Sequence, residues 1–259
     1  MKKILITGTR GGIGLDAATR LLDKGHTVYA TVHCEKDIAP LKEKLAAYGE
    51  SAIIEKLDIL LQSDRDKVNN WDIDVLINNA AIGDSGPLAE IAADRVREVI
   101  ETNVIATLQL TQNVLKQMKK RRQGRIIFIS SLAGMVPTPF FSPYGLTKYA
   151  IESISGALRK EIKPFDIFVS TVNPGGYDTG FNKKNIEKKY EWLDETTLDP
   201  AEHRAMKNEE AMIYFFEMKS TASIAKKVVK AVEARRPAKR YIAPWWQGLG
   251  VFFIRMFNL

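Results

Sequence analysis

The sequence predicts an α/β fold, and three observations carry that prediction. The chain has 259 residues, 45% of them hydrophobic and 27% charged, which is typical of a globular domain rather than a disordered or fibrous protein. A short apolar run, Ile4 to Ile6, leads into a glycine-rich turn and then into a helical pattern. Strand-like and helix-like segments then alternate along the chain. We therefore expect one domain over residues 1–259.

Charge and cysteine content narrow the class of protein. The formal net charge is +7, but the basic residues are spread along apparent helices, so we interpret them as solvated charge and not as a nucleic-acid site. The single cysteine, Cys34, excludes an intrachain disulfide, fits a reducing compartment and gives no support to a metal site. The start, Met1 to Lys3, resembles a secretion signal, but an apolar run of only three residues follows it. We expect a cytoplasmic protein.

The first strand, turn and helix have the pattern of a dinucleotide site. Gly8 permits a tight turn, Gly12 lets backbone amides approach a pyrophosphate, and Gly14 lets the helix from Leu15 to Lys24 lie close to the strand. An ordinary turn is the weaker alternative, because strand and helix flank this loop. The predicted cofactor contacts from the loop are Gly8, Thr9, Arg10, Gly12, Ile13 and Gly14.

The next strand, Thr27 to His33, bears on the choice of nucleotide. NAD sites commonly have an acid at the end of this strand, whereas NADP sites need a cation for the 2′-phosphate. His33 ends the strand, no acid occurs before Glu35, and Arg10 lies on the side of the 2′-phosphate. We therefore predict NADP(H), with NAD(H) as the alternative. Arg10 as a solvent-exposed turn residue is the competing interpretation.

Two further strands place polar residues at the same edge of the sheet. A helix from Asp37 to Tyr48 precedes the strand Ala52 to Leu57, and Asp58 after that strand either binds the adenine or caps the next helix. The strand Val75 to Ile77 runs into Asn78-Asn79-Ala80-Ala81. These small residues and amides suit a chain that passes beside a cofactor, so Asn79 and Ala80 are predicted contacts.

A long helical pattern from Pro87 to Arg122, as one or two helices, contains Asn103 in an apolar stretch. A buried asparagine is either a structural clamp or part of a polar site, because its amide must be hydrogen-bonded. The strand Arg125 to Ile129 follows and ends in Ser130 and Ser131.

Tyr144 and Lys148 are four residues apart, so on a helix they share one face about 6 Å from each other. A nearby cation favours the phenolate form of a tyrosine and brings it toward the range of an acid–base catalyst. Such a pair alone is weak, since it occurs by chance on many solvated helices.

Taken together, these motifs resemble the short-chain dehydrogenase/reductase family in its compact single-domain branch. The resemblance covers about residues 3–180. Ala81 departs from it, because the family usually has glycine there. The motifs are, in order, Thr7-Gly8-x-x-x-Gly12-x-Gly14, Asn78-Asn79-Ala80, Asn103, Ser131, Tyr144-x-x-x-Lys148 and, after the strand Ile167 to Val172, Asn173-Pro174-Gly175-Gly176-Tyr177-Asp178-Thr179.

The resemblance implies a Rossmann-like, doubly wound fold of about seven parallel strands with helices on both faces. It implies that Tyr144 exchanges a proton with the substrate oxygen, which Ser131 holds, while Lys148 favours the phenolate and binds the nicotinamide ribose. Asn103 would hold a water that links Lys148 to solvent. The implied contacts to the nicotinamide end are Pro174, Gly175 and Thr179.

The remainder of the chain is expected to define the substrate. Residues 180–220 mix lysine, glutamate and aromatic residues, which favours short amphipathic helices as a substrate lid, or simply a surface helix pair. A helix from Ala222 to Arg235 and a last strand, Arg240 to Ile242, come next. The apolar tail, residues 245–259, is too short to cross a bilayer. We favour packing on a second subunit or on the substrate pocket, with peripheral membrane contact as the alternative.

The leading functional prediction is an NADP(H)-dependent oxidoreductase for a small hydrophobic ketone or secondary alcohol, assembled as a homodimer or homotetramer. Two alternatives stay open: a reductase of 3-oxoacyl thioesters, and a non-catalytic NADP(H)-binding redox sensor that signals through a partner. The presence of Asn103, Ser131, Tyr144 and Lys148 together favours catalysis.

Overall fold

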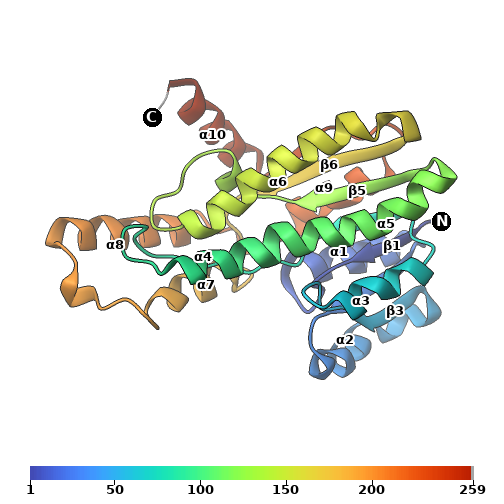
Figure 1. Cartoon of the computed structure of the whole chain (residues 1–259), viewed down its shortest axis with the longest axis horizontal. Coiled ribbons are helices and arrows are strands. Elements are labelled where there is room, and N and C mark those ends of the chain that lie inside the picture. Colours follow the sequence, from blue (N-terminus) through green and yellow to red (C-terminus); the bar gives the residue numbers. More distant parts are fainter. Residues whose placement is uncertain (258–259) are drawn as a thin grey trace.

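A computed structural model describes residues 1–257. Within these residues a seven-stranded parallel sheet forms the centre of the molecule, in the order β3-β2-β1-β4-β5-β6-β7 (Figure 1). The observed sheet confirms the predicted doubly wound architecture. The strands are β1 (Lys3–Ile6), β2 (Thr27–Val32), β3 (Ala52–Lys56), β4 (Val75–Asn78), β5 (Gly124–Ile129), β6 (Ile167–Pro174) and β7 (Arg240–Ala243).

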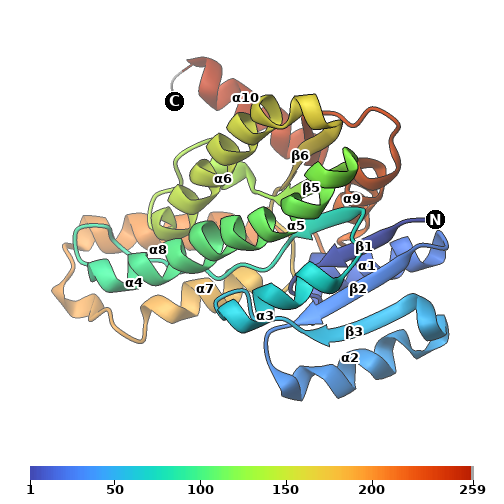
Figure 2. The ribbon, with the colours of Figure 1, turned by 45° about the vertical axis from the view of Figure 1, so that its right-hand side comes forward.

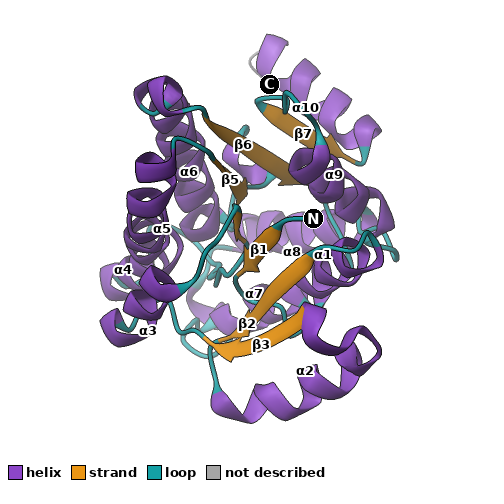
Figure 3. Cartoon of the chain, turned by 90° about the vertical axis from the view of Figure 1, so that its right-hand side faces the viewer, coloured by secondary structure: helices purple, strands orange, loops and turns teal. Residues whose placement is uncertain are grey.

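Helices cover both faces of this sheet (Figure 3). One core lies between the sheet and α1, α2 and α9, and a second lies between the sheet and α5 and α6. The α-helices are α1 (Gly12–Asp23), α2 (Ile38–Leu45), α3 (Gln62–Lys67), α4 (Ala93–Ile100), α5 (Thr107–Arg121), α6 (Ser142–Glu161), α7 (Phe181–Lys189), α8 (Pro200–Phe215), α9 (Ala222–Glu233) and α10 (Trp245–Phe257).

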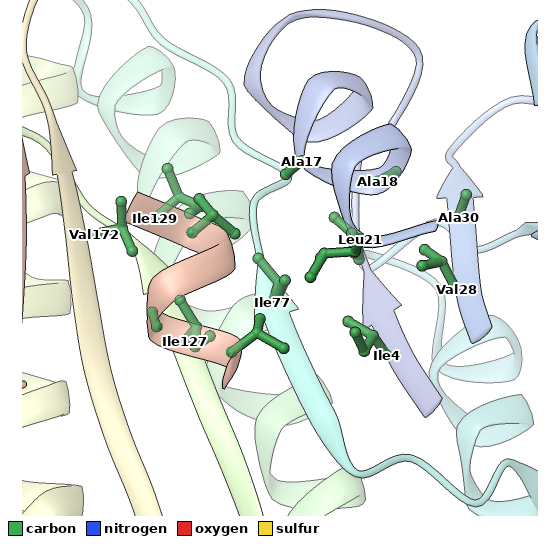
Figure 4. Packing of buried hydrophobic residues seen from close by; sticks show 14 of the residues in the cluster. Ile4, Ala17, Ala18, Leu21, Val28, Ala30, Ile77, Ile127, Ile129 and Val172 are labelled. Atoms are coloured by element: carbon green, nitrogen blue, oxygen red, sulfur yellow. The ribbon is translucent and has the colours of Figure 1, made fainter. Parts of the chain in front are cut away.

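The first helix packs closely on the sheet because its inner face is small. Ala17 and Ala18 point toward the strands, and Leu21 fills the space between β1 and β2 (Figure 4). On the sheet side, Ile4 and Ile77 complete this contact. The close packing fixes the start of α1 beside the ends of β1 and β4, where the strand order reverses and a crevice opens for a ligand.

The helical pattern predicted from Pro87 to Arg122 starts later and contains an irregular turn. Residues 88–90 form a turn, and the helix begins at Ala93 after the extended Ala92. Between α4 and α5 the chain forms a π-helical turn, Glu101–Ala106, which contains the buried Asn103. Such turns insert one residue into a helix and often occur at functional sites.

The segments expected to define the substrate lie beyond the carboxyl ends of the strands. Helices α7 and α8 lie beside α4 at one end of the molecule, and α10 leaves β7 to project with the carboxyl end of the chain (Figures 1 and 2). The last two residues of the predicted tail, Asn258 and Leu259, lie outside the described residues. In the described part of the chain, no helix combines the length and apolar character needed to span a bilayer.

Candidate active site

A cavity of about 970 Å³ runs along the carboxyl ends of the central strands. Its first half is lined by the glycine loop, the end of β2 and the loops after β3 and β4. Its second half is lined by the end of β5, the start of α6, and parts of α7, α8 and α10. The predicted site residues on its wall are Gly8, Arg10, Gly12, Ile13, Gly14, His33, Asp58, Asn79, Ala80, Ser131, Tyr144, Lys148, Pro174, Gly175 and Thr179.

The glycine loop fits a dinucleotide, because side chains would fill the spaces that its glycines leave. Gly12 has a φ of +58°, and a Cβ there would lie 3.2 Å from the Cβ of Thr179. At Gly14 a Cβ would lie 2.6 Å from the Asn79 amide nitrogen and 2.6 Å from the Gly8 carbonyl oxygen. Gly14 thus lets α1 lie close to the Gly8 turn. Because Gly11 and Gly12 line the cavity without side chains, the backbone at the start of α1 is open to a pyrophosphate.

The loops after β1 and β4 are tied together by the hydroxyl of Thr7. It accepts hydrogen bonds from the backbone N–H groups of Asn79 (3.0 Å) and Ala80 (2.9 Å). The Asn79 side chain in turn donates to the carbonyls of Thr7 and Gly8, at 2.9 Å each. These bonds hold Asn79 and Ala80 at the cavity wall. Both hydrogens of the Asn79 side-chain amide nitrogen are thereby donated to protein carbonyls.

Thr9 differs from the other predicted loop residues, because its side chain is turned away from the cavity. It is fully buried, and its hydroxyl donates to the Thr31 carbonyl at 3.1 Å. Its role in the described structure is to bind the loop to β2. Asp58 does line the cavity, while its carboxylate accepts from the Leu60 N–H at 3.0 Å. The alternative that Asp58 caps the next helix is wrong, because α3 begins at Gln62 after Leu61 without a side-chain cap; its place on the cavity wall leaves the adenine contact as a prediction.

Arg10 stands half exposed, and both Arg10 and His33 line the cavity. Its guanidinium lies 3.8 Å from a carboxylate oxygen of Asp37. The sequence does not reveal this pair, because Arg10 lies in the glycine loop and Asp37 lies in the helical turn after β2. The Asp37 carboxylate therefore lies beside the residue, Arg10, that the sequence predicts to bind a 2′-phosphate.

Tyr144 and Lys148 lie on one face of α6, both buried, with the ammonium 5.3 Å from the centre of the phenol ring. Pro143 in the first turn favours the start of this helix. A Cβ at Gly134 would lie 2.8 Å from the carbonyl of Lys148, so glycine at that position allows α6 to approach the end of β5. The Lys148 ammonium donates to the Ile129 carbonyl at 2.8 Å. The rings of Phe141 and Phe181 flank Tyr144.

Burial dominates the protonation of this pair. It raises the pKa of Tyr144 above its ordinary value, and the Ser131 hydroxyl opposes that rise. It lowers the pKa of Lys148 to about 8, against the field of Glu152, one turn further along α6. The expectation that Lys148 brings the pKa of Tyr144 down is thus wrong for this structure. The reason is that desolvation of the buried phenolate outweighs the hydrogen bond from Ser131, while the Lys148 ammonium is bonded to the Ile129 carbonyl.

Ser131 lies two residues after the end of β5 and caps the short 3-10 helix Leu132–Gly134, its hydroxyl accepting from the Ala133 N–H at 3.1 Å. The buried amide of Asn173 donates to the Ser131 carbonyl at 3.2 Å and to the Glu152 carboxylate at 2.7 Å. Glu152 also pairs with Arg240. Sequence reasoning did not single out Asn173 as a positioning residue, nor Glu152 at all, although Glu152 shares the helix face of Lys148 at a spacing of four.

Asn103 acts through its side chain as a clamp. Its oxygen accepts from the Ile82 N–H at 2.9 Å, and its nitrogen donates to the Ile82 carbonyl at 2.7 Å and to the Thr147 hydroxyl at 3.1 Å. These bonds connect the loop after β4 to α6, next to Lys148. One of the two alternatives from the sequence is therefore observed, and the side-chain amide is engaged by partners within the protein.

The tail contributes a residue that the sequence could not reveal. The Gln247 side chain accepts from the Gly176 N–H at 2.8 Å and donates to the Phe216 carbonyl at 2.7 Å. It thereby joins α10, the chain after β6 and the end of α8. The cavity wall beyond Tyr144 is mainly apolar, formed by Leu132, Phe141, Phe181, Met212, Ile213, Phe216, Trp246, Val251 and Ile254.

Comparison with known proteins agrees with this geometry. The family model described as short chain dehydrogenase matches residues 2–190. Human 17-beta-hydroxysteroid dehydrogenase type 1 is 30% identical over 92% of this chain and 76% of its own length. The 3-ketodihydrosphingosine reductase of Bacteroides thetaiotaomicron is 34% identical over 71% of this chain and 68% of its own length.

Solved structures share the fold. A short-chain dehydrogenase from Streptomyces avermitilis superposes with a TM-score of 0.83 at 25% identity, covering 99% of this chain and 93% of that one. A short-chain dehydrogenase/reductase from Burkholderia phymatum, solved in complex with NAD, superposes with a TM-score of 0.82 at 18% identity, covering 98% of this chain and 93% of that one. A short-chain dehydrogenase from Sphingobium yanoikuyae, solved in complex with NADPH, superposes with a TM-score of 0.75 at 21% identity, covering 100% of this chain and 96% of that one. The chain belongs to the short-chain dehydrogenase family, oxidoreductases that act on alcohols and ketones with a nicotinamide cofactor.

Proposed function

We propose that this protein is an NADP(H)-dependent reductase of hydrophobic ketones, or in reverse a dehydrogenase of the alcohols, with Tyr144 as the acid–base residue. One observation carries the proposal. The buried Tyr144 phenol, with Ser131 and Lys148, lines the junction between the glycine-loop half of the cavity and its apolar half. A carbonyl bound there reaches both a proton donor and the cofactor end.

Three protein residues, Tyr144, Ser131 and Lys148, have different roles at the carbonyl oxygen of the substrate. A bound nicotinamide supplies or accepts the hydride. Because burial keeps the Tyr144 phenol protonated, this residue donates its proton as the oxygen gains charge during reduction. The Ser131 hydroxyl holds the same oxygen, and the Lys148 ammonium stabilises the phenolate that remains. In the oxidising direction Tyr144 takes the proton back.

Replacing Tyr144→Phe tests the acid–base assignment. The variant loses the proton donor but keeps the ring packing, so we expect kcat to fall by about 10²- to 10⁴-fold with NADPH affinity nearly unchanged. Tyr149→Phe is the matched control, because that tyrosine lies on the same helix with 41% of its surface exposed. Near-normal turnover by Tyr144→Phe would remove Tyr144 from the mechanism.

The preference for NADP(H) rests on Arg10 and on the lack of an acid at the end of β2. We expect Arg10→Ala to weaken NADPH binding by about tenfold or more, as for a lost charge-assisted phosphate contact, and to change NADH binding little. Because Asp37 pairs with Arg10, Asp37→Asn should strengthen NADPH binding. An unchanged NADPH/NADH ratio in both variants would refute a 2′-phosphate site at Arg10.

The apolar wall beyond Tyr144 supports a lipophilic substrate, and the two relatives are named for a hydroxysteroid and for 3-ketodihydrosphingosine. The assay follows NADPH absorbance against ketosteroids, long-chain ketones and 3-oxoacyl thioesters. Turnover of thioesters alone would select the acyl-thioester alternative. Tight NADPH binding with no turnover would favour the sensor alternative. Light scattering on the purified chain tests the predicted homodimer or homotetramer.

A further inference from the structure

Residues 83–86 form a loop that packs against α7, one of the helices expected to belong to a substrate lid. Asp84 in this loop is fully buried, with 0% of its surface exposed. A buried carboxylate must be paired, because desolvation of an unpaired charge is strongly unfavourable. The Asp84 carboxylate accepts from the Arg95 Nε at 2.9 Å and from the Ser85 N–H at 2.9 Å, and the Lys188 ammonium lies 3.9 Å away. The loop is therefore held by charge at a buried point.

Arg95 on α4 extends this contact to the carboxyl end of α7. Its Nη2 donates to the Lys188 carbonyl at 3.3 Å, in the last turn of α7, where the helix dipole favours a cation. Its guanidinium also lies 5.8 Å from the centre of the Trp192 ring, just after this helix. Asp84 thus holds Arg95, and Arg95 holds α7, which lies beside α4 at one end of the molecule (Figures 1 and 2).

The loop also contacts the middle of α7 directly. The Ser85 hydroxyl donates to the Asn185 carbonyl at 2.6 Å, and both residues are buried. A Cβ at Gly83 would lie 2.4 Å from the Asn185 side-chain nitrogen, and a Cβ at Gly86 would lie 2.5 Å from the Trp192 ring. Such short separations force a movement, so even one methyl group would push the loop and α7 apart.

The amino end of α7 contacts the proposed acid–base residue. Phe181 is the first residue of α7, and its ring lies 5.2 Å from the Tyr144 ring, centre to centre. Ile186 belongs to the same apolar cluster as Phe141 and Tyr144. Phe181 also lines the cavity. The contacts at the middle and the carboxyl end of α7 therefore fix the part of this helix that forms the cavity wall beside Tyr144.

We propose that Asp84 and Arg95 are positioning residues that keep α7 fixed beside Tyr144, so that this helix is a permanent wall of the substrate half and not a lid that opens. The catalytic consequence rests on the proposed function, whereas the contacts do not depend on it. A fixed wall limits which ketones can place their oxygen at the Tyr144 phenol. A displacement of about 1 Å in such a wall is enough to lower turnover by about 10²-fold.

Hydrogen exchange measured by mass spectrometry on the full chain tests the position of α7 without any turnover. Asp84→Asn weakens the bond to Arg95, and Ser85→Ala removes one bond to α7 with less risk to folding. We expect the α7 amides to exchange about tenfold faster in the first variant and about fivefold faster in the second. The matched control is Glu187→Gln, which breaks an exposed pair with Lys183 on α7 itself and should leave the exchange unchanged.

Equal exchange of α7 in the wild type, Asp84→Asn and Ser85→Ala would overturn the proposal. So would a wild-type α7 that exchanges as fast as an exposed loop, because a helix fixed by these contacts must be protected from exchange.

Turnover tests the positioning role separately. The φ of Gly83 is not positive, and the three atoms nearest to a Cβ there all belong to the Asn185 side chain. We expect Gly83→Ala to lower kcat for a lipophilic ketone at least about tenfold, with unchanged affinity for NADPH. Adding Asn185→Ala removes the clash and should restore kcat. This second change loses no bond of the Asn185 side-chain nitrogen, which has no hydrogen-bond partner among residues 1–257.

Normal kcat in Gly83→Ala, or a loss that Asn185→Ala does not restore, would refute the positioning role. If the wild type turns over no ketone, the proposed function fails, and hydrogen exchange alone decides whether α7 is fixed.

Discussion

Gly14 offers a sharp test of how the first helix is held against the sheet. In Gly14→Ala the new Cβ would lie 2.6 Å from the Asn79 amide nitrogen and 2.6 Å from the Gly8 carbonyl oxygen. Separations below 3.0 Å force a movement. The Gly8 carbonyl is part of the backbone turn, so the variant must displace the Asn79 amide and also shift α1 away from that turn.

The expected cost follows from the hydrogen bonds that the new methyl group would break. Asn79 gives up its two bonds, to Thr7 and Gly8, which costs about 2 kcal/mol. Overpacking adds about 1–3 kcal/mol, and the better helix propensity of alanine returns about 1 kcal/mol. We expect Gly14→Ala to reduce the free energy of unfolding by about 2–4 kcal/mol. Urea unfolding followed by circular dichroism measures this as a lower midpoint at an unchanged slope.

The chain supplies its own control. Gly156 also lies inside a helix, α6, and a Cβ there would have no heavy atom within 4 Å. Gly156→Ala should therefore raise the free energy of unfolding by about 0.5–1 kcal/mol. If Gly14→Ala is as stable as the wild type while Gly156→Ala behaves as expected, the close contact at Gly14 does not exist and the reasoning fails.

Two further predictions concern pH. Burial opposes ionisation of Asp64, but hydrogen bonds from Lys56, Lys67 and the Asp58 N–H lower its pKa to about 2. The ionised Asp64 therefore contributes up to about 2 kcal/mol to the free energy of unfolding. This contribution is complete above about pH 4 and is lost as the pH falls toward 2. Asp64→Asn should remove that part of the acid destabilisation in urea titrations at several pH values, and an unaltered acid slope would count against it. Glu152→Gln removes the charge that raises the pKa of Lys148, so the alkaline fall in reductase activity should start at lower pH; an identical pH profile would show that Glu152 does not act on Lys148.

The sheet and the glycine loop could be predicted because their signals are local. Each strand is an apolar run that ends in a polar or small residue, and the carboxyl ends of parallel strands meet at one edge. The positions of Ser131 and Tyr144 follow from that rule, since one lies just after β5 and the other lies in the first turn of the next α-helix, α6. For the same reason the sequence indicates the edge of the sheet along which the cavity lies.

The remainder depends on contacts between distant segments, which leave no local signal. Gln247 meets Gly176 only because β6 and β7 are neighbours in the sheet, which brings the start of α10 beside the chain that follows β6. Thr9 looks like a loop residue in the sequence, yet its hydroxyl is used by Thr31. The pKa of Tyr144 was predicted in the wrong direction because a Tyr–Lys spacing reveals the charge and not the burial.

The π-helical turn at Asn103 has a geometric reason. The helix from Ala93 to Arg121 bonds both the end of β4, through Thr111 to Asn78, and the loop after it, through Asn103 to Ile82. Positions eight apart on a regular α-helix are rotated by about 80° from one another. One inserted residue makes the spacing equivalent to seven, which brings the two positions to within about 20° of the same face. The extra residue thus brings Asn103 and Thr111 to one face of the helix, from which they hold the two ends of the 78–82 segment along the cofactor half of the cavity.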